Sequence, residues 1–342
     1  MERRSFFKQI FVFTLSLSSA VLVASCSSTP TDSDTTETAS TPAEVEEINF
    51  GIISTESQAN QKPVWEPFIE AMSEEIGIPV NAFYATQYAG VIEGMRAGKV
   101  QVAWYGGKSY VEAAKRADAE VFSQVINADG TKGYYSYLIT NKDNPIVAQA
   151  KAMGGDKYVV ENAKDLTFAF NDPNSTSGFL VPSFYVFAKN GVNPKQAFKR
   201  LVFAGNHEAT ALAVANNQVD VATNNSEAVD RLEKTNPEAR EKIEVIWTST
   251  LIPSDPIAYR KDLPADLKEK IQEFFYNYQD ESVLQPLEWQ GFAPVDDSTW
   301  DPIRELDVGK KILEVESNEN LSPEDKQKKL EELNKELEAI KN

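Results

Sequence analysis

Three consecutive hydroxyl side chains at a predicted helix start are typical of an anion-binding site. Ser175, Thr176 and Ser177 precede Gly178 and an apolar helical run. Hydroxyl groups and the free N–H groups of a helix N-terminus bind anions, and glycine lets a ligand approach the backbone closely. A single serine would suffice for an ordinary helix cap, so the segment by itself leaves both interpretations open. Pro182, inside the same run, predicts a kink or a later helix start.

Further polar side chains lie at other predicted strand ends. His207, the only histidine, follows Gly205 and Asn206 at a helix start. As an imidazolium it would donate to an oxyanion, although an isolated histidine is more often a core or surface residue. Glu227 opens another helix, where the helix dipole alone favours an acid, and Asp255 lies in a proline-flanked segment typical of a rigid turn. Tyrosine at a cleft rim can supply a hydroxyl, and the aromatic residues near loop ends are Tyr88, Trp104, Tyr105, Tyr134 and Tyr135.

These residue types could also form a hydrolase triad, with a serine, His207 and an acid. The nucleophile elbow Gly-x-Ser-x-Gly is absent, because the segment ending at Gly178 reads Asn-Ser-Thr-Ser-Gly. One histidine and one cysteine exclude the usual transition-metal clusters, and the chain has neither a phosphate-binding loop nor a dinucleotide fingerprint. We therefore expect no cofactor and no metal, and ligand capture rather than catalysis.

The elements that would position these side chains alternate along the chain. Predicted strands cover 48–53, 100–105, 166–170, 201–204, 219–223 and 244–247, and predicted helices cover 65–76, 88–97, 109–117, 178–189, 208–217, 227–233 and 265–278. Such alternation indicates an α/β fold with largely parallel sheets. Ligands bind beyond the carboxyl ends of strands in open α/β sheets. The polar clusters follow predicted strands and could therefore meet in one cleft: 54–57, 106–109, 171–178, 205–208 and 224–227.

Length and charge limit the architecture and the partners. The chain has 342 residues, with 34 Lys and Arg against 52 Asp and Glu, which gives a formal net charge of −18. A chain of this length exceeds one compact core and predicts two lobes. The acidity argues against nucleic acid or an anionic lipid surface as the partner, because both need basic patches.

The N-terminal segment is predicted to direct export. Residues 1–25 combine a short basic start with an apolar stretch, which is typical of a signal peptide. The segment Val23-Ala24-Ser25-Cys26 resembles a bacterial lipobox, and Cys26 is the only cysteine. We expect Cys26 to carry a lipid, the alternative being a chance cysteine in a cleaved signal. Residues 26–46 are polar and predict a disordered tether. The expected location is the periplasm or cell surface, with the membrane contacted only through that lipid.

The C-terminal residues 316–342 predict a separate helix. Ser322 followed by Pro323 and an acid is a helix-start signal. A leucine-rich stripe follows at helical spacing, formed by Leu330, Leu333, Leu337 and Ile340. The stripe is too short for an autonomous coiled coil but long enough for docking or for a homodimer contact.

Several long motifs resemble the phosphonate-binding protein of the phosphonate ABC transporter, the PhnD family. They are residues 48–58 (INFGIISTESQ), 172–182 (DPNSTSGFLVP), 219–225 (VDVATNN) followed by Glu227, and 251–253 (LIP) followed by Asp255. The similarity extends over about residues 47–315. It implies a type II periplasmic-binding-protein fold, in which two α/β lobes joined by a two-strand hinge close on a ligand. On this basis lobe 1 comprises 47–139 and 252–315, and lobe 2 comprises 140–251.

The resemblance also implies roles for individual residues. The phosphonate would be held by Ser175, Thr176, Ser177, His207 and Tyr88, and the amino group of 2-aminoethylphosphonate by Glu227, Asp255 and Tyr134. The implied function is a solute receptor that captures phosphonates and delivers them to an ABC transporter permease. Two departures from the family pattern are Gln87, where an acid is expected, and the added Asn206.

Three other functions are alternatives to a phosphonate receptor. A receptor for phosphite, phosphate or another small oxyanion would keep the anion site, but it gains nothing from two acids. A secreted serine–histidine hydrolase would turn over phosphonate or phosphate esters. A purely adhesive lipoprotein would show no response to small ligands.

Overall fold

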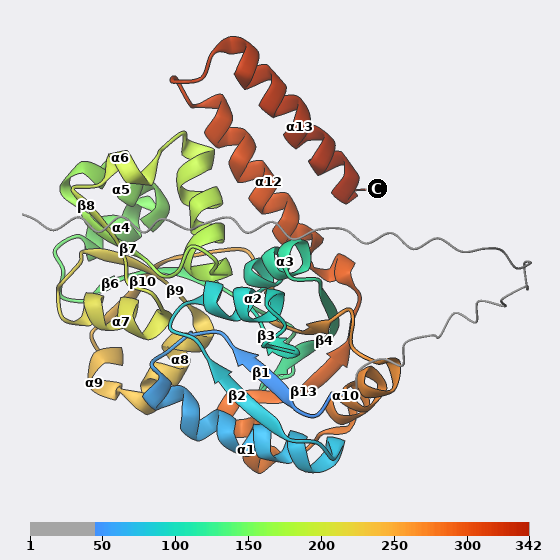
Figure 1. Ribbon diagram of the computed structural model, residues 1–342. Helices are drawn as coiled ribbons and strands as arrows, with labels where there is room; N and C mark the ends of the chain where they lie inside the picture. Colours follow the sequence, from blue (N-terminus) through green and yellow to red (C-terminus); the bar gives the residue numbers. More distant parts are fainter. Residues whose placement is uncertain (1–44, 342) are drawn as a thin grey trace, which may run out of the picture. The chain divides into compact units, whose positions relative to one another are not determined.

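The structure is a computed structural model that describes residues 45–341 (Figure 1). The predicted signal peptide 1–25, Cys26 and most of the predicted tether 26–46 lie outside the described residues. Within residues 45–341, no helix combines the length and the apolar character needed to cross a bilayer.

The first lobe is built on a six-stranded sheet in the order β13-β4-β12-β3-β1-β2. Its strands are β1 (Ile48–Ile52), β2 (Val80–Tyr84), β3 (Val102–Trp104), β4 (Ala119–Asn127), β12 (Pro256–Arg260) and β13 (Trp289–Pro294). The helices of this part of the chain are α1 (Gln58–Ile76), α2 (Tyr88–Arg96), α3 (Gly107–Arg116), α10 (Ala265–Asn277) and α11 (Glu281–Leu284). A cluster of aromatic rings that includes Phe50, Trp65, Phe68 and Phe275 fills the core of this lobe.

The second lobe is built on a five-stranded sheet in the order β10-β6-β9-β7-β8. Its strands are β6 (Ser136–Asn141), β7 (Thr167–Phe170), β8 (Arg200–Phe203), β9 (Val221–Asn225) and β10 (Ile243–Thr248). Side chains alternate between the faces of a strand. Phe168 and Phe170 of β7 therefore enter one apolar cluster and Ala169 enters another. The α-helices of this lobe are α4 (Val147–Met153), α5 (Gly155–Glu161), α6 (Pro194–Ala197), α7 (His207–Ala215), α8 (Ser226–Thr235) and α9 (Pro237–Arg240).

Two crossing segments join the lobes, as expected for a two-strand hinge. The short strands β5 (Gly133–Tyr134) and β11 (Ile252–Pro253) pair antiparallel between them. The expectation of largely parallel sheets is wrong. Strands β4, β12 and β13 pair antiparallel in the first sheet, and β6 pairs antiparallel with β9 and β10 in the second. The two antiparallel hinge segments feed strands of opposite direction into both sheets, so each sheet is mixed.

Asparagine caps begin the two helices that point at the lobe boundary. The Oδ1 atom of Asn206 accepts from the N–H of Ala209 at 2.7 Å at the start of α7. The Oδ1 atom of Asn225 accepts from the N–H of Ala228 at 2.7 Å at the start of α8. Each cap replaces a missing intrahelical bond and fixes where the first turn lies. The added Asn206 is therefore a helix cap, with His207 as the first helical residue.

The helix around Pro182 begins before the proline and is wound more widely than an α-helix. Two π-helical segments, Thr176–Leu180 and Ser183–Phe187, flank it. The N–H of Val181 reaches back five residues to the carbonyl of Thr176. Proline lacks the N–H that a regular helix needs, and a π-helical turn accommodates that loss, as often happens near functional sites.

Two helices complete the chain, α12 (Asp301–Glu316) and α13 (Pro323–Lys341). They form an antiparallel pair in Figure 1. Ser322 caps α13 as expected, since its Oγ accepts from the N–H of Asp325 at 3.1 Å. The leucine-rich stripe of α13 is half-buried, and Leu337 lines one hollow together with Leu306 of α12. The stripe is thus partly covered within the chain itself.

Candidate functional site

One cavity between the lobes contains every binding residue predicted from the sequence. Its empty space, including the opening, is about 590 Å³, which suits a small solute. Its lining includes all eight of them: Tyr88, Tyr134, Ser175, Thr176, Ser177, His207, Glu227 and Asp255. They come from strand ends, helix starts and the hinge of both lobes. The polar clusters at strand ends therefore converge as expected. The cluster 106–109 reaches the cavity only through Gly106.

The three hydroxyl residues make different hydrogen bonds at the helix start. Ser175 is the cap, because its Oγ accepts from the N–H of Gly178 at 3.0 Å. The Oγ1 atom of Thr176 accepts from the N–H of Lys108, in the first lobe, at 2.9 Å. Ser177 is fully buried, and its Oγ accepts from the side-chain amide of Asn225 at 3.3 Å. An ordinary helix cap thus explains Ser175 alone. Thr176 and Ser177 remain available to an anion at this helix N-terminus.

Two carboxylates and a tyrosine line the same cavity and suit a cation, in contrast to the anion-binding helix start. Burial raises the pKa of Glu227 to about 7. Burial, followed by repulsion from Glu227, raises the pKa of Asp255 well above its ordinary value. The pKa of Tyr134 is raised by burial and by both acids, so its hydroxyl stays protonated. Like charges this close favour a shared proton or a bound cation.

The surroundings of His207 in the empty cavity disfavour the imidazolium form considered from the sequence. The side chain is 2 % exposed, and burial together with the positive charge of Arg231 lowers its pKa to about 3. A neutral ring carries one proton and so acts as a donor through one nitrogen only. The burial that causes this shift depends on packing from both lobes and is invisible in the sequence.

Tyr88 begins α2 and is 2 % exposed. Its N–H donates to the Asp172 carboxylate at 3.3 Å, which links the first lobe to the loop before the hydroxyl residues. Gln87, the departure from the family pattern, is exposed and makes no side-chain cap. It lies outside the cavity lining.

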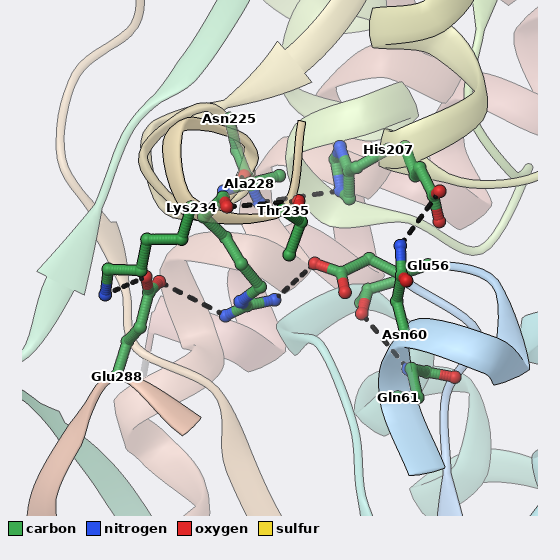
Figure 2. Close-up of polar contacts among 12 residues, drawn as sticks. Glu56, Asn60, Gln61, His207, Asn225, Ala228, Lys234, Thr235 and Glu288 are labelled. Atoms are coloured by element: carbon green, nitrogen blue, oxygen red, sulfur yellow. Dashed lines mark hydrogen bonds and ion pairs between the residues drawn. The ribbon is translucent and has the colours of Figure 1, made fainter. Parts of the chain in front are cut away.

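A cluster of charges that the sequence did not predict includes two residues of the cavity lining, Arg231 and Glu288. Arg231, one helical turn after Glu227, lies 2.8 Å from Glu56 and 3.4 Å from Glu288 across the lobe boundary. Lys234 pairs with the other oxygen of Glu288 at 2.9 Å. Figure 2 shows Glu56 and Glu288 on two sides of this cluster. Glu227 and Arg231 have the spacing of neighbours on one helix face, which is a usable sequence signal. Glu56 belongs to the polar cluster 54–57. Glu288 follows the short 3₁₀ helix Gln285–Leu287, and no sequence pattern predicts its role.

Further contacts cross between the lobes near the cavity. Glu208 of α7 accepts from the N–H of Ser57 at 2.7 Å and from the side-chain amide of Asn60 at 3.0 Å. The N–H of His207 donates to the carbonyl of Thr55 at 3.0 Å. Among residues 45–341, no group of acids, histidine and cysteine is arranged to hold a metal ion.

Comparison with known proteins gives a consistent result. Residues 50–300 match the family model described as "ABC transporter, phosphonate, periplasmic substrate-binding protein". The chain is 49 % identical over 307 residues to the phosphonates-binding periplasmic protein of Escherichia coli K12, covering 87 % of this chain and 88 % of that one. It is 27 % identical to a phosphate-import protein of Mycolicibacterium smegmatis, with coverages of 84 % and 92 %.

A solved structure resembles the whole of this fold. The crystal structure of a binding-protein component of an ABC phosphonate transporter from Pseudomonas aeruginosa matches with a TM-score of 0.82 and 48 % identity. The match covers 87 % of this chain and 97 % of that one.

Proposed function

Because the chain belongs to the family of periplasmic substrate-binding proteins of phosphonate ABC transporters, we propose that its ligand is 2-aminoethylphosphonate. Family membership makes the protein the periplasmic phosphonate-binding component of an importer, with the type II periplasmic-binding-protein fold. It is a solute receptor and not a hydrolase. The finer statement about the amine rests on the cavity.

The observation that carries the proposal is the pair Glu227 and Asp255 in the cavity that also holds the Ser175–Ser177 helix start. Hydroxyl and N–H donors suit a phosphonate, and two carboxylates with raised pKa values suit an ammonium. A ligand with both groups satisfies both ends. An alkylphosphonate would leave the acids unpaired, and sites built around such bonds reject analogues lacking the group by several orders of magnitude.

Calorimetric titration of the untethered protein with 2-aminoethylphosphonate, ethylphosphonate and phosphate tests this assignment. We expect tight binding of the first ligand only. Tight binding of ethylphosphonate with equal strength would remove the role of the acid pair. Tight binding of phosphate alone would support the second candidate, an oxyanion receptor, which the similarity to a phosphate-import protein favours.

Binding of the amine should release protons near pH 7. Glu227 has a pKa of about 7 in the empty cavity, so a substantial fraction is protonated there. An ammonium beside the carboxylate lowers that pKa and expels the proton. Titrations at pH 7 in buffers of different ionisation enthalpy should give different heats for 2-aminoethylphosphonate. Ethylphosphonate is the control, and equal heats in all buffers for both ligands would contradict the expected protonation of Glu227.

We also propose the lobe division expected from the sequence, with one boundary moved. The division places 47–139 and 252–315 in lobe 1 and 140–251 in lobe 2. All of β6 pairs with β9 and β10 of the second sheet, which supports a boundary at residue 136 instead of 140.

Lipid anchoring through Cys26 remains a proposal supported by the lipobox-like segment that ends there. A Cys26→Ala chain should move from the membrane fraction to the soluble periplasmic fraction. An unchanged distribution between the fractions would contradict the anchor.

A homodimer through the C-terminal helix likewise remains a proposal. Because Leu337 is already half-covered beside α12, only part of the stripe is free for a second copy. Sedimentation of a chain truncated after Glu316 should show a smaller assembly than the full chain. Equal sedimentation as monomers would contradict the dimer.

A further inference from the structure

We propose that Asn225 fixes the direction of the hydrogen bonds at the phosphonate end of the cavity, so that Ser177 and His207 both present protons to the ligand. The inference rests on the proposed function and assigns to Asn225 the part of a positioning residue. Asn225 is the last residue of β9, lines the cavity and is 6 % exposed.

The orientation of the Asn225 amide follows from its role as a helix cap. Its Oδ1 accepts from the N–H of Ala228 at 2.7 Å, so the oxygen must face α8 and the NH₂ group must face the cavity side. Asn224 supports this arrangement. Its Oδ1 accepts from the N–H of Asn225 at 2.9 Å, and its amide donates to the carbonyl of His207 and to Thr210, both at 2.9 Å.

The NH₂ group of Asn225 has two neighbours, the Oγ of Ser177 at 3.3 Å and the Nε2 of His207 at 3.5 Å. The Asn225 and His207 side chains face each other in Figure 2. An amide nitrogen only donates, so both neighbours must accept. A serine oxygen that accepts leaves its own proton free. A neutral imidazole that accepts through Nε2 carries its proton on Nδ1.

The Nδ1 atom of His207 is buried and has no hydrogen-bond partner within the described part of the chain. Nearly all buried polar groups are paired, so a bare N–H beside a binding cavity needs an acceptor. A phosphonate oxygen supplies one. The Ser177 hydroxyl also has a side-chain hydrogen bond with Tyr134, so its proton is shared between the Tyr134 oxygen and a ligand in the cavity. The Ser177 hydroxyl and the His207 ring can each donate or accept. Asn225 thus fixes both as donors to the ligand without contacting the anion itself.

The single histidine of the chain allows a direct test. In untagged protein labelled with ¹⁵N-histidine, long-range ¹H–¹⁵N correlation spectra report which ring nitrogen carries the proton. We expect Nδ1–H and a bare Nε2 in the ligand-free protein. A proton on Nε2 in the unaltered chain would overturn the proposal, whatever ligand the protein binds.

The variant Asn225→Asp keeps the cap and the shape but can only accept at both oxygens. We expect Nε2 to gain a proton, the Ser177 proton to turn toward the new carboxylate, and affinity for 2-aminoethylphosphonate and ethylphosphonate to fall alike, by about 10- to 100-fold. The variant Asn225→Ser also caps α8 but is too short to reach His207, so its ring should lose the fixed Nδ1–H form. An unchanged ring proton in both variants would refute the positioning role.

The matched control is Asn206→Asp, which adds the same charge at the cap of the neighbouring helix, where the side chain faces the N–H of Ala209. Its ring proton and its affinities should stay close to those of the unaltered chain. His207→Ala should weaken both phosphonates similarly. If unaltered protein binds phosphate instead of 2-aminoethylphosphonate, the proposed function fails, while the spectra of the ligand-free protein still decide the inference. If 2-aminoethylphosphonate binds and Asn225→Asp changes neither spectrum nor affinity, only the inference fails.

Discussion

Replacing Glu227 by glutamine should weaken 2-aminoethylphosphonate binding by about two to three orders of magnitude and leave ethylphosphonate binding unchanged or tighter. Removing one partner of a buried hydrogen-bonded charge pair costs roughly 2–5 kcal/mol. Glu227 lies beside Asp255 in the cavity, so a bound ammonium loses half of its countercharge. Ethylphosphonate has no ammonium, and the variant removes a carboxylate that it would leave unpaired.

The control for this variant is Glu233→Gln, which removes the same charge from an exposed position on the same helix. It should leave both affinities within a few-fold. Calorimetry with both ligands gives the comparison. Equal losses for the two ligands in Glu227→Gln would remove the assigned amine role, since the damage would then lie in the shared phosphonate end.

The same variant should make the ligand-free protein more stable above about pH 7. The pKa of Glu227 is raised from 4.5 to about 7 in the folded state, so the folded state holds more protons than the unfolded state between these values. The free energy of unfolding must then fall as pH rises through that window. Glutamine removes this slope. A site that costs stability when empty and binds tightly when filled is typical of binding sites adapted to function.

The sequence predicted the location of the cavity better than the direction of the strands around it. All six predicted strands are present, with ends shifted by a few residues, as β1 and β9 illustrate. They are short apolar runs whose pattern is local. The hinge strand β11 has two residues, and β12 includes Pro256; neither carries a pattern strong enough to detect. Strand direction depends on where the chain crosses between lobes, which is a long-range property.

The site residues divide in a similar way. The Ser175–Ser177 start and His207 each lie a few residues beyond a strand that the sequence predicts, and the parallel pairing of β7 with β8 brings the ends of these strands to the same edge of the sheet. The neutrality of His207 and the raised pKa of Asp255 arise from burial by both lobes. The two partners of Arg231 are distant in the sequence: Glu288 is 57 residues away and Glu56 is 175 residues away. No spacing rule connects residues at such separations, and only the folded chain shows that they meet.

Replacing Arg231 by methionine should weaken every ligand by about one to two orders of magnitude. The guanidinium of α8, in the second lobe, contacts Glu56 and Glu288, which belong to the first lobe, so its ion pairs form across the cleft. The side chains of these acids are 8 % and 16 % exposed. Breaking a buried pair by removing one partner costs about 3–5 kcal/mol, and partial exposure reduces that cost. The variant therefore weakens the contacts between the lobes, so the loss of affinity does not depend on which end a ligand has.

The amine ligand should suffer an additional loss in this variant. The positive charge of Arg231 lowers the pKa values of Glu227 and Asp255 against the effect of burial. Without it the acids stay protonated to higher pH, and a neutral carboxyl attracts an ammonium less. Affinity for 2-aminoethylphosphonate should therefore recover as pH rises above 7, whereas affinity for ethylphosphonate should not follow that trend.

Two further variants separate closure from charge tuning. Lys234→Met removes the neighbouring cation, whose side chain is 69 % exposed, and should change affinities only slightly. Glu56→Gln combined with Arg231→Met should bind better than Arg231→Met alone, because it removes one of the carboxylates left unpaired. Small-angle scattering with saturating ligand reports whether the lobes still close. If Arg231→Met weakens 2-aminoethylphosphonate alone and closes normally with ethylphosphonate, the arginine acts only on Glu227 and Asp255, and its contacts across the cleft are incidental to closure.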